Sequence, residues 1–144
     1  MIIMNIIYIN CNPMRVRNLQ MKLFTPDAFS FQKYVIALHG FAGSMESWAI
    51  TALAEKLTEQ DTAVIAFNYP GHGTDKQEEL FSFGNCIRDL QEVIEYMNIR
   101  YPDAVCQGIF ATSFGGYITL ISMKMIPESV RIVLRAPAVN MQEV

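Results

Sequence analysis

The sequence has few of the residues on which disulfide scaffolds and metal centres depend. Its 144 residues include three cysteines and two histidines. The cysteines, Cys11, Cys86 and Cys106, are odd in number and widely spaced, so they match neither a disulfide framework nor a zinc pattern. We expect reduced thiols, and no cluster of side chains implies a metal or an organic cofactor.

Charge is sparse as well, and it is balanced. The 11 lysine and arginine residues and 14 aspartate and glutamate residues give a net charge of −3, with no basic run and no acidic tail. This distribution argues against nucleic acid or an anionic membrane surface as a partner. No run approaches the ~20 apolar residues of a membrane span. The opening "MIIMNIIYIN" lacks a basic start and is broken by Asn5, so it is better explained as a strand than as a signal peptide. We therefore expect a cytoplasmic protein.

Apolar sequence, in contrast, is abundant. Hydrophobic residues make up 51% of the chain, which suits one domain built on a sheet buried on both faces. Four apolar runs rich in β-branched or aromatic residues predict short buried strands, three of them followed by turn residues and a stretch of helical period. These runs are "YVIALHG", "TAVIAFNYPG", "GIFATS" and "VRIVLRAP". Nearer the N-terminus, "IIYIN" and "RNLQMKLFTP" predict an antiparallel hairpin that leads into the parallel sheet.

Three helices are predicted between the strands. Each has one face of apolar residues at helical spacing: Ile50, Leu53, Ala54 and Leu57 in the first, Phe83, Ile87, Leu90, Ile94 and Met97 in the second, and Phe114, Ile118, Ile121 and Met125 in the third. Pro127 is expected to end the third helix. The alternation predicts an α/β fold with a mostly parallel open sheet and helices on both faces. In such sheets, function collects at the carboxyl ends of the strands.

Unusual residues follow three of the predicted strands. After the first comes "HGFAGS", in which Gly40 and Gly43 let the backbone turn sharply. Its amide groups can then point into the space above the sheet and hold an oxyanion. The alternative is an ordinary strand-to-helix loop with Ser44 as the N-cap.

The second of these strands ends in "NYPGHGTD", where Pro70, Gly71 and Gly73 make a rigid turn. His72 is a candidate catalytic base. However, a histidine between two glycines more often fixes such a turn through a backbone hydrogen bond, and we favour that role. Asp75 is expected to be a solvated loop or cap residue.

The third strand runs into "GIFATSFGGYITL", which places Ser113 between a strand and a helix. A turn that holds one side chain at its apex strains the backbone and requires small residues two positions away, and Ala111 and Gly115 meet that demand. Gly116 gives the helix room to pack against the strand. Ser113 is therefore a candidate nucleophile, with the Phe114 amide beside it free to stabilise an anion. The alternative is that Ser113 merely caps the helix.

In this order, the three turns resemble the α/β-hydrolase superfamily, and within it the serine esterase, lysophospholipase and acylglycerol-lipase-like group often grouped with serine aminopeptidases. The resemblance rests on His39–Phe41, Tyr69–Gly73 and Ala111–Gly116, with "LRAPAV" matching the strand after the elbow helix. It covers nearly the whole chain from Tyr34 onward. The usual elbow is G-x-S-x-G, and here Ala111 replaces the first glycine with another small residue.

The resemblance implies a serine hydrolase that acts on small-molecule carboxylic esters. Ser113 would attack the ester carbonyl, and the amides of Phe41 and Phe114 would form the oxyanion hole. A histidine and an acid would complete the triad, and in this family both follow the strand spelled "VRIVLRAP". His39 and His72 precede the serine, in positions that the family uses for the oxyanion turn and for a structural turn.

The resemblance also implies that residues 1–144 are the N-terminal part of a single α/β-hydrolase domain, without the lid and without the strands that carry the acid and the histidine. Glu143 could mimic a rarer placement of the acid. The final strand would be an exposed apolar edge, which favours a homo-oligomer or a partner chain. Three hypotheses remain open: a serine esterase that is incomplete in this chain, a catalytically silent interaction module or partner-completed fragment, and acyl transfer to an acceptor other than water.

Aromatic residues near the motifs could line an apolar pocket for a short or medium acyl chain. They are Phe41, Trp48, Phe114 and Tyr117. For Trp48, packing in the core is the outcome that we favour.

Overall fold

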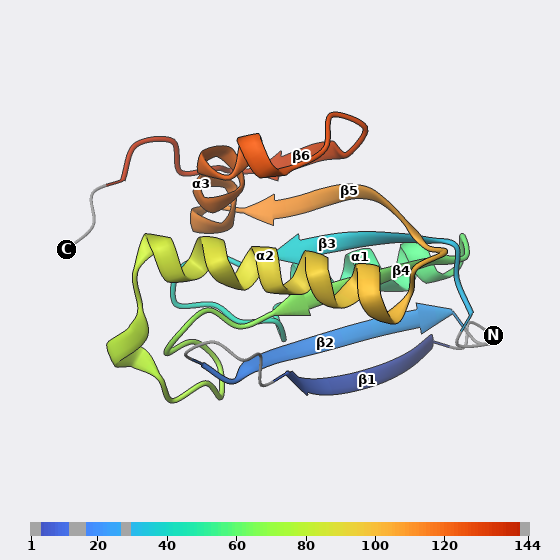
Figure 1. Cartoon of the computed structure of the whole chain (residues 1–144), viewed down its shortest axis with the longest axis horizontal. Coiled ribbons are helices and arrows are strands. Elements are labelled where there is room, and N and C mark those ends of the chain that lie inside the picture. The colour runs from blue at the N-terminus through green and yellow to red at the C-terminus, as the bar shows by residue number, and fades with distance from the viewer. Residues whose placement is uncertain (1–3, 12–16, 27–29, 142–144) are drawn as a thin grey trace.

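The computed structural model describes residues 4–11, 17–26 and 30–141. The strands in these residues are β1 (Met4–Cys11), β2 (Leu19–Pro26), β3 (Lys33–Leu38), β4 (Thr62–Phe67), β5 (Val105–Thr112) and β6 (Arg131–Arg135). They form one sheet in the order β1-β2-β4-β3-β5-β6 (Figure 1). β3 to β6 run parallel, whereas β2 is antiparallel to both β1 and β4. The predicted hairpin and the mostly parallel sheet are both confirmed.

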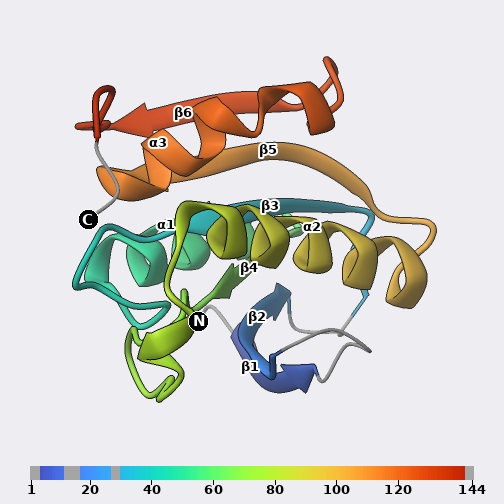
Figure 2. The same ribbon diagram turned by 60° about the vertical axis from the view of Figure 1, so that its left-hand side comes forward.

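Helices lie on both faces of the sheet, as predicted. They are α1 (Trp48–Thr58), α2 (Phe83–Arg100) and α3 (Phe114–Ile121). α1 lies on one face, and α2 and α3 lie on the other (Figures 1 and 2). The two faces have separate cores: Ile50 and Ala54 of α1 pack in one, and Leu90 and Met97 of α2 pack with Ile118 of α3 in the other.

The burial of β4 explains why its sequence is continuously apolar after Thr62. All 6 of its residues are buried. Val64 and Ala66 belong to the core under α1, whereas Ala63, Ile65 and Phe67 belong to the core under α2 and α3. A strand covered on both faces has no position that favours a polar side chain, so the alternation typical of half-exposed strands is absent.

The third helix is shorter than predicted. α3 ends at Ile121, and Met123–Met125 form a separate 3₁₀ turn ahead of Pro127. The amides of Ser122 and Met125 donate to carbonyls three residues back, which tightens the chain into this geometry. Apolar spacing continues through the 3₁₀ turn, so periodicity alone places the helix end too late.

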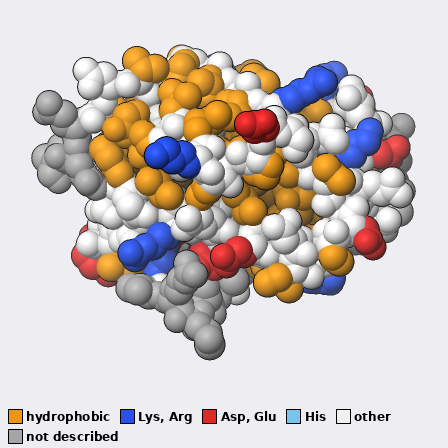
Figure 3. Space-filling model, turned by 45° about the horizontal axis from the view of Figure 1, so that its top comes forward, with side chains coloured by type: hydrophobic (Ala, Val, Ile, Leu, Met, Phe, Trp, Pro, Cys, Tyr) orange, Lys and Arg blue, Asp and Glu red, His pale blue; other side chains and the backbone are white. Residues whose placement is uncertain are grey.

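β6 is an exposed edge, so the prediction of a buried strand from its apolar run is wrong, whereas the prediction of an exposed apolar edge is confirmed. Val133 is 58% exposed. Within the described residues β6 pairs only with β5. Figure 3 shows hydrophobic side chains gathered on the face that includes this edge. An apolar run indicates that a strand tends to be buried. It does not show whether a neighbouring strand is present on each side to bury it.

The order of the strands fixes where a site can form. From β3 the chain passes through α1 to β4 on one side of β3, and then returns through α2 to β5 on the other side. The connections after β3 and β5 therefore leave from neighbouring strands, and the crevice at such a reversal of strand order is where open α/β sheets bind ligands. Two of the three predicted motifs follow these two strands.

Candidate active site

Ser113 stands at the end of β5 in a backbone conformation that serine rarely adopts. Its φ is 51° and its ψ is −114°. α3 begins at the next residue, yet the Ser113 side chain makes no capping hydrogen bond. Ser47 and Ser82, in contrast, cap α1 and α2 by accepting hydrogen bonds from the amides of Ile50 and Asn85. The alternative that Ser113 merely caps the helix is therefore wrong.

The strained turn is held through the backbone of Ser113. Its amide donates to the carbonyl of Arg135 at 3.0 Å, and its carbonyl accepts from the amides of Gly116 at 2.9 Å and Ala138 at 3.0 Å. The end of β6 and the segment after it thus hold the backbone of Ser113 in place. Strain of this kind persists only where surrounding contacts over-determine the conformation.

The two glycines after Ser113 allow close contacts on both sides of α3. A Cβ at Gly115 would lie 2.7 Å from the carbonyl oxygens of Leu38 and His39. A Cβ at Gly116 would lie 2.8 Å from the Cβ of Pro137. The predicted demand for a small residue two positions after Ser113 is confirmed, because Gly115 at the start of α3 lies directly against the end of β3. At Gly116 the close neighbour is Pro137, which follows β6.

The first and third predicted motifs meet at this point. A Cβ built at Gly40 would lie 3.4 Å from the Cβ of Ser113. The following residues turn back on themselves, since the Gly43 amide donates to the Gly40 carbonyl at 3.0 Å and Ala42 has a φ of 62°. Among the described residues, the backbone hydrogen bonds outside helices and strands include none donated by the amides of Phe41 or Phe114.

His39 is a neutral part of the loop. It is 1% exposed, and burial lowers its pKa to about 4 although its bond to Gly40 acts in the opposite direction. Nδ1 donates to the Gly40 carbonyl at 2.7 Å, and Nε2 accepts from the Tyr69 amide at 3.5 Å. Because both ring nitrogens are engaged, His39 does not supply a base to Ser113.

His72 fixes its own turn, as predicted. Its Nδ1 donates to the Pro70 carbonyl at 2.9 Å, and the ring is 7% exposed. The ring lies against Phe41 and His39, with centroids 5.4 Å away in both cases. The turn that carries His72 therefore packs against the loop that carries His39 and Phe41.

Asp75 is buried and ion-paired, so the prediction of a solvated residue is wrong. Its carboxylate accepts from the amides of Gly71 at 2.9 Å and Gln77 at 2.8 Å, and from Arg17 at 2.6 Å. Arg17 also donates to Asp89 of α2 at 2.9 Å. This network ties the turn that carries His72 to α2.

The sequence contained one signal for this network. Asp89 falls among Cys86, Leu90 and Val93 on the buried face of α2, where an acidic side chain requires a cationic partner. Burial raises the pKa of Asp89 to about 6 although Arg17 acts in the opposite direction. Nothing in the sequence singled out Arg17 as that partner.

The aromatic residues near the site take different positions. Phe114 is 1% exposed and belongs to the core, whereas Phe41 is 62% exposed and meets the ring of Phe81 at 5.8 Å. Trp48 is 78% exposed at the start of α1, so the prediction that it packs in the core is wrong. Of the first-turn residues of α1, Ile50 occupies the buried face instead.

Several further predictions can be placed. Among the described residues, Cys86 and Cys106 form no disulfide, while the side chain of Cys11 and all of Glu143 lie outside the described residues. In the described ranges, no group of three or more His, Cys, Asp or Glu side chains is arranged to hold a metal ion. No helix in the same ranges is long and apolar enough to cross a membrane.

The chain resembles known proteins both in sequence and in fold. The family model described as serine aminopeptidase, S33, matches residues 30–144. A lidless α/β serine hydrolase from Xanthomonas campestris is 23% identical with a TM-score of 0.76, and the match covers 97% of this chain and 64% of that one. Dienelactone hydrolase from Anabaena variabilis is 20% identical with a TM-score of 0.75, covering 93% and 64%. Est1E from Butyrivibrio proteoclasticus, solved with ferulic acid, is 25% identical with a TM-score of 0.67, covering 83% and 47%.

These likenesses confirm the α/β-hydrolase fold. The chain spans about half to two thirds of the length of the solved structures that it matches. No curated protein matches it in sequence.

Proposed function

Because the chain belongs to the serine aminopeptidase S33 family of α/β hydrolases, we propose that it carries the nucleophile and the oxyanion hole of a serine hydrolase that acts on carboxylic esters. One observation carries the proposal: Ser113 is held in a left-handed conformation at the turn from β5 to α3, directly beside Gly40 of the loop after β3. A capping role would not require such strain, whereas exposure of a nucleophilic hydroxyl does.

The proposed chemistry begins with attack of Ser113 Oγ on the carbonyl carbon of the ester. The carbonyl oxygen becomes an oxyanion, and the amides of Phe41 and Phe114 donate hydrogen bonds to it. Each donor of this kind contributes about 10²- to 10³-fold in rate. The position of Phe114 at the first turn of α3 adds the positive end of the helix dipole.

A base must accept the proton of Ser113 for this attack to proceed at neutral pH. His39 and His72 are both held by backbone hydrogen bonds, so we propose that the histidine and its orienting acid come from chain beyond residues 1–144 or from a partner. Residues 1–144 would then be the N-terminal part of a single domain. Location in the cytoplasm and association through the β6 edge also stay predictions.

The exposed ring of Phe41 suggests the kind of acyl group that the site accepts. It stands next to the Gly40 turn and contacts the rings of His72 and Phe81. An aromatic wall beside the nucleophile favours an apolar acyl chain over a charged one. We therefore propose short or medium acyl esters as substrates.

The test is hydrolysis of p-nitrophenyl butyrate by the native protein and by its S113A variant. Loss of the nucleophile should lower kcat by at least about 10³-fold, because the oxyanion hole alone retains only a small part of the rate enhancement. The matched control is Ser129→Ala, which removes the hydroxyl of an exposed serine between α3 and β6. Unchanged hydrolysis by S113A would refute the proposed role of Ser113.

Both histidine side chains are held by hydrogen bonds to backbone carbonyls. This observation also supports a second candidate function, a catalytically silent interaction module. This candidate predicts no turnover of any ester and no covalent labelling of Ser113 by a fluorophosphonate. Stoichiometric labelling of Ser113, detected by peptide mass spectrometry, would exclude it, because labelling requires an activated serine.

A further inference from the structure

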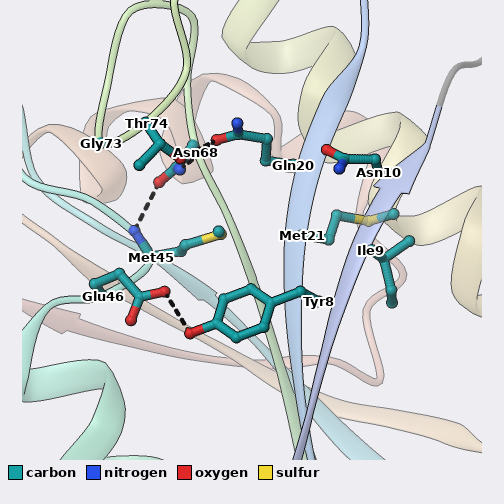
Figure 4. A pocket seen from close by; sticks show the side chains of 10 residues that line it. All are labelled: Tyr8, Ile9, Asn10, Gln20, Met21, Met45, Glu46, Asn68, Gly73 and Thr74. Carbon is teal, nitrogen blue, oxygen red and sulfur yellow. Dashed lines mark hydrogen bonds between the residues drawn. The ribbon is translucent and has the colours of Figure 1, made fainter.

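A pocket that does not include Ser113 opens beside β1 and β2 (Figure 4). Its volume is about 390 Å³, within the range of small-molecule sites. The segment Met45–Glu46 before α1 and the turn Gly73–Thr74 after β4 form two of its walls. Ile9 and Met21 lie directly opposite each other in the β1–β2 ladder and form its floor through their backbone, since their side chains belong to the core on the other face.

Polar side chains occupy the face of the hairpin that borders the pocket. Asn10 and Gln20 are direct cross-strand partners, as are Tyr8 and Lys22. Cross-strand partners stand on the same face of a sheet, and so do residues two apart along a strand. Figure 4 shows the amides of Gln20 and Asn10 toward one end of the pocket and the pair Tyr8 and Glu46 toward the other.

The amide of Gln20 has a fixed orientation. Its Oε1 accepts from Asn68 Nδ2 at 2.9 Å and from Thr74 Oγ1 at 3.1 Å. Asn68 cannot be flipped, because its Oδ1 accepts from the Met45 amide at 2.8 Å. Both lone pairs of Gln20 Oε1 are therefore used, and its Nε2 keeps two hydrogen-bond donors in a defined direction.

The opposite end of the pocket has no net charge. Tyr8 donates its hydroxyl to Glu46 Oε1 at 3.0 Å, and Lys22 donates to Glu46 Oε2 at 2.7 Å. The ammonium group of Lys22 lies 5.4 Å from the centroid of the Tyr8 ring. Tyr8 is 62% exposed. The pocket thus offers an aromatic surface beside a neutralised carboxylate.

We propose that this pocket binds an uncharged ligand with several hydroxyl groups and one apolar face, of which a pyranose sugar is the representative. Hydroxyl groups both donate and accept, so they match the donors of Gln20, the amide of Asn10 and the remaining lone pairs of Glu46. The C–H face of the ring would lie on Tyr8. An ion of either sign would gain no balancing charge from the Lys22–Glu46 pair and would lose its hydration. The site is independent of the proposed hydrolase function.

The test is a titration of the protein, labelled with ¹³C at its methionine methyl groups, with methyl β-D-glucopyranoside, methyl β-D-galactopyranoside and methyl α-D-mannopyranoside. The Met45 methyl signal, assigned with a Met45→Leu variant, should shift in a saturable manner with at least one sugar, with a Kd of roughly 1–10 mM. The S113A variant should bind the sugar with the same Kd as the wild-type protein. Failure of this proposal can therefore be told apart from failure of the proposed hydrolase function. Failure of all three sugars to shift the signal would overturn the proposal.

Two variants test whether the side chains named here bind the sugar. Gln20→Glu keeps an acceptor for Asn68 and Thr74 and removes the two donors, and Asn10→Ala removes an exposed amide. Each should weaken binding by about fivefold or more. Asn98→Ala, an exposed amide on α2, is the matched control and should not change the Kd. Equal binding by all variants, or saturable binding of sodium benzoate in preference to the sugars, would also overturn the proposal.

Discussion

A serine in the left-handed region of backbone space is held there at a cost of roughly 1–3 kcal/mol. At Ser113 this cost is met by the hydrogen bonds of its amide and carbonyl to Arg135, Gly116 and Ala138. The hydroxyl itself contributes no capping bond to α3. Backbone strain and the free hydroxyl therefore occur at the same residue, as we expect if Ser113 is the proposed nucleophile.

Replacing Ser113 with glycine should consequently stabilise the protein while removing its hydroxyl. Glycine adopts positive φ without a Cβ clash, so we expect Ser113→Gly to raise the free energy of unfolding by about 1 kcal/mol. Urea denaturation monitored by circular dichroism measures the change. The control Ser129→Gly lies in an exposed segment and should leave stability unchanged or lower it slightly. A less stable Ser113→Gly variant would contradict the assignment of strain to this residue.

Asp89 makes stability depend on pH in a direction unusual for an ion-paired carboxylate. Its carboxyl group shares Arg17 with Asp75, and its Oδ2 is buried without a hydrogen-bond partner among the described residues. Burial raises its pKa from 3.8 to about 6 against the opposing effect of Arg17. Between these values the folded protein binds more protons than the unfolded chain, so stability from this group falls as the pH rises from about 4 to 6.

The variant Asp89→Asn should remove that fall. We expect the free energy of unfolding of the wild-type protein to decrease by on the order of 2 kcal/mol across this range, and that of the variant to decrease clearly less. Urea midpoints at intervals of pH between these limits provide the measurement. The pKa of Asp75 is lowered instead, since its amide bonds and Arg17 outweigh its burial, so its contribution is lost at more acid pH. If both proteins had the same pH profile, Asp89 would not be the titrating group.

At the scale of elements, the site depends on how closely α3 approaches β3. Gly115 brings the first turn of the helix against the carbonyls of Leu38 and His39, and this contact sets Ser113 beside Gly40. The sequence predicted that the residue two positions after the serine must be small, but it did not identify β3 as the neighbour of this residue. It could not predict that Arg135 and Ala138 complete the turn, because backbone hydrogen bonds leave no signature in residue type.

Gly115→Ala should therefore disrupt the junction of α3 and β3. Its Cβ would lie 2.7 Å from two backbone oxygens that cannot move without shifting β3, so we expect a loss of about 2–4 kcal/mol in unfolding free energy. The matched control is Gly84→Ala in the first turn of α2, where the nearest atom to a new Cβ is Ser82 Oγ at 3.9 Å. That variant should be neutral or more stable by a few tenths to 1 kcal/mol. A neutral Gly115→Ala would contradict the close approach.

Across the whole molecule, the sequence predicted the layers and the turns that follow the strands better than it predicted the exposure of side chains. Apolar periodicity located each helix face, and turn residues marked the strand ends. Asp75 lies in the interior because it pairs with Arg17, which is distant in sequence. Trp48 is exposed, and Ile50 and Ala54 occupy the buried face of α1 instead. Residue type alone encodes neither outcome, so both residues were predicted in the wrong environment.

The exposed edge of the sheet should govern self-association. Val133 stands between Arg131 and Arg135 on the outward-facing positions of β6. Val133→Lys would remove the apolar centre of this strand and place a third positive charge there, so we expect weaker concentration-dependent association with little change in unfolding free energy. Light scattering across a concentration series measures this effect. Lys124→Ala, a change of charge away from β6, is the control, and equal association of Val133→Lys and wild type would show that another surface is used.

The hydrogen bonds that bracket Ser113 have a consequence for the order in which the protein is made. β5 and α3 leave the ribosome before the residues that hold Ser113 in place, since Arg135 and Ala138 follow it by more than twenty positions. A nascent chain that has reached Met125 already contains the serine and its glycines but lacks the contacts that enforce the strained turn. The strained backbone at Ser113 is thus held only after β6 and the residues that follow it have emerged, and we expect an emerging chain to pass through its early folding with Ser113 still in a relaxed backbone.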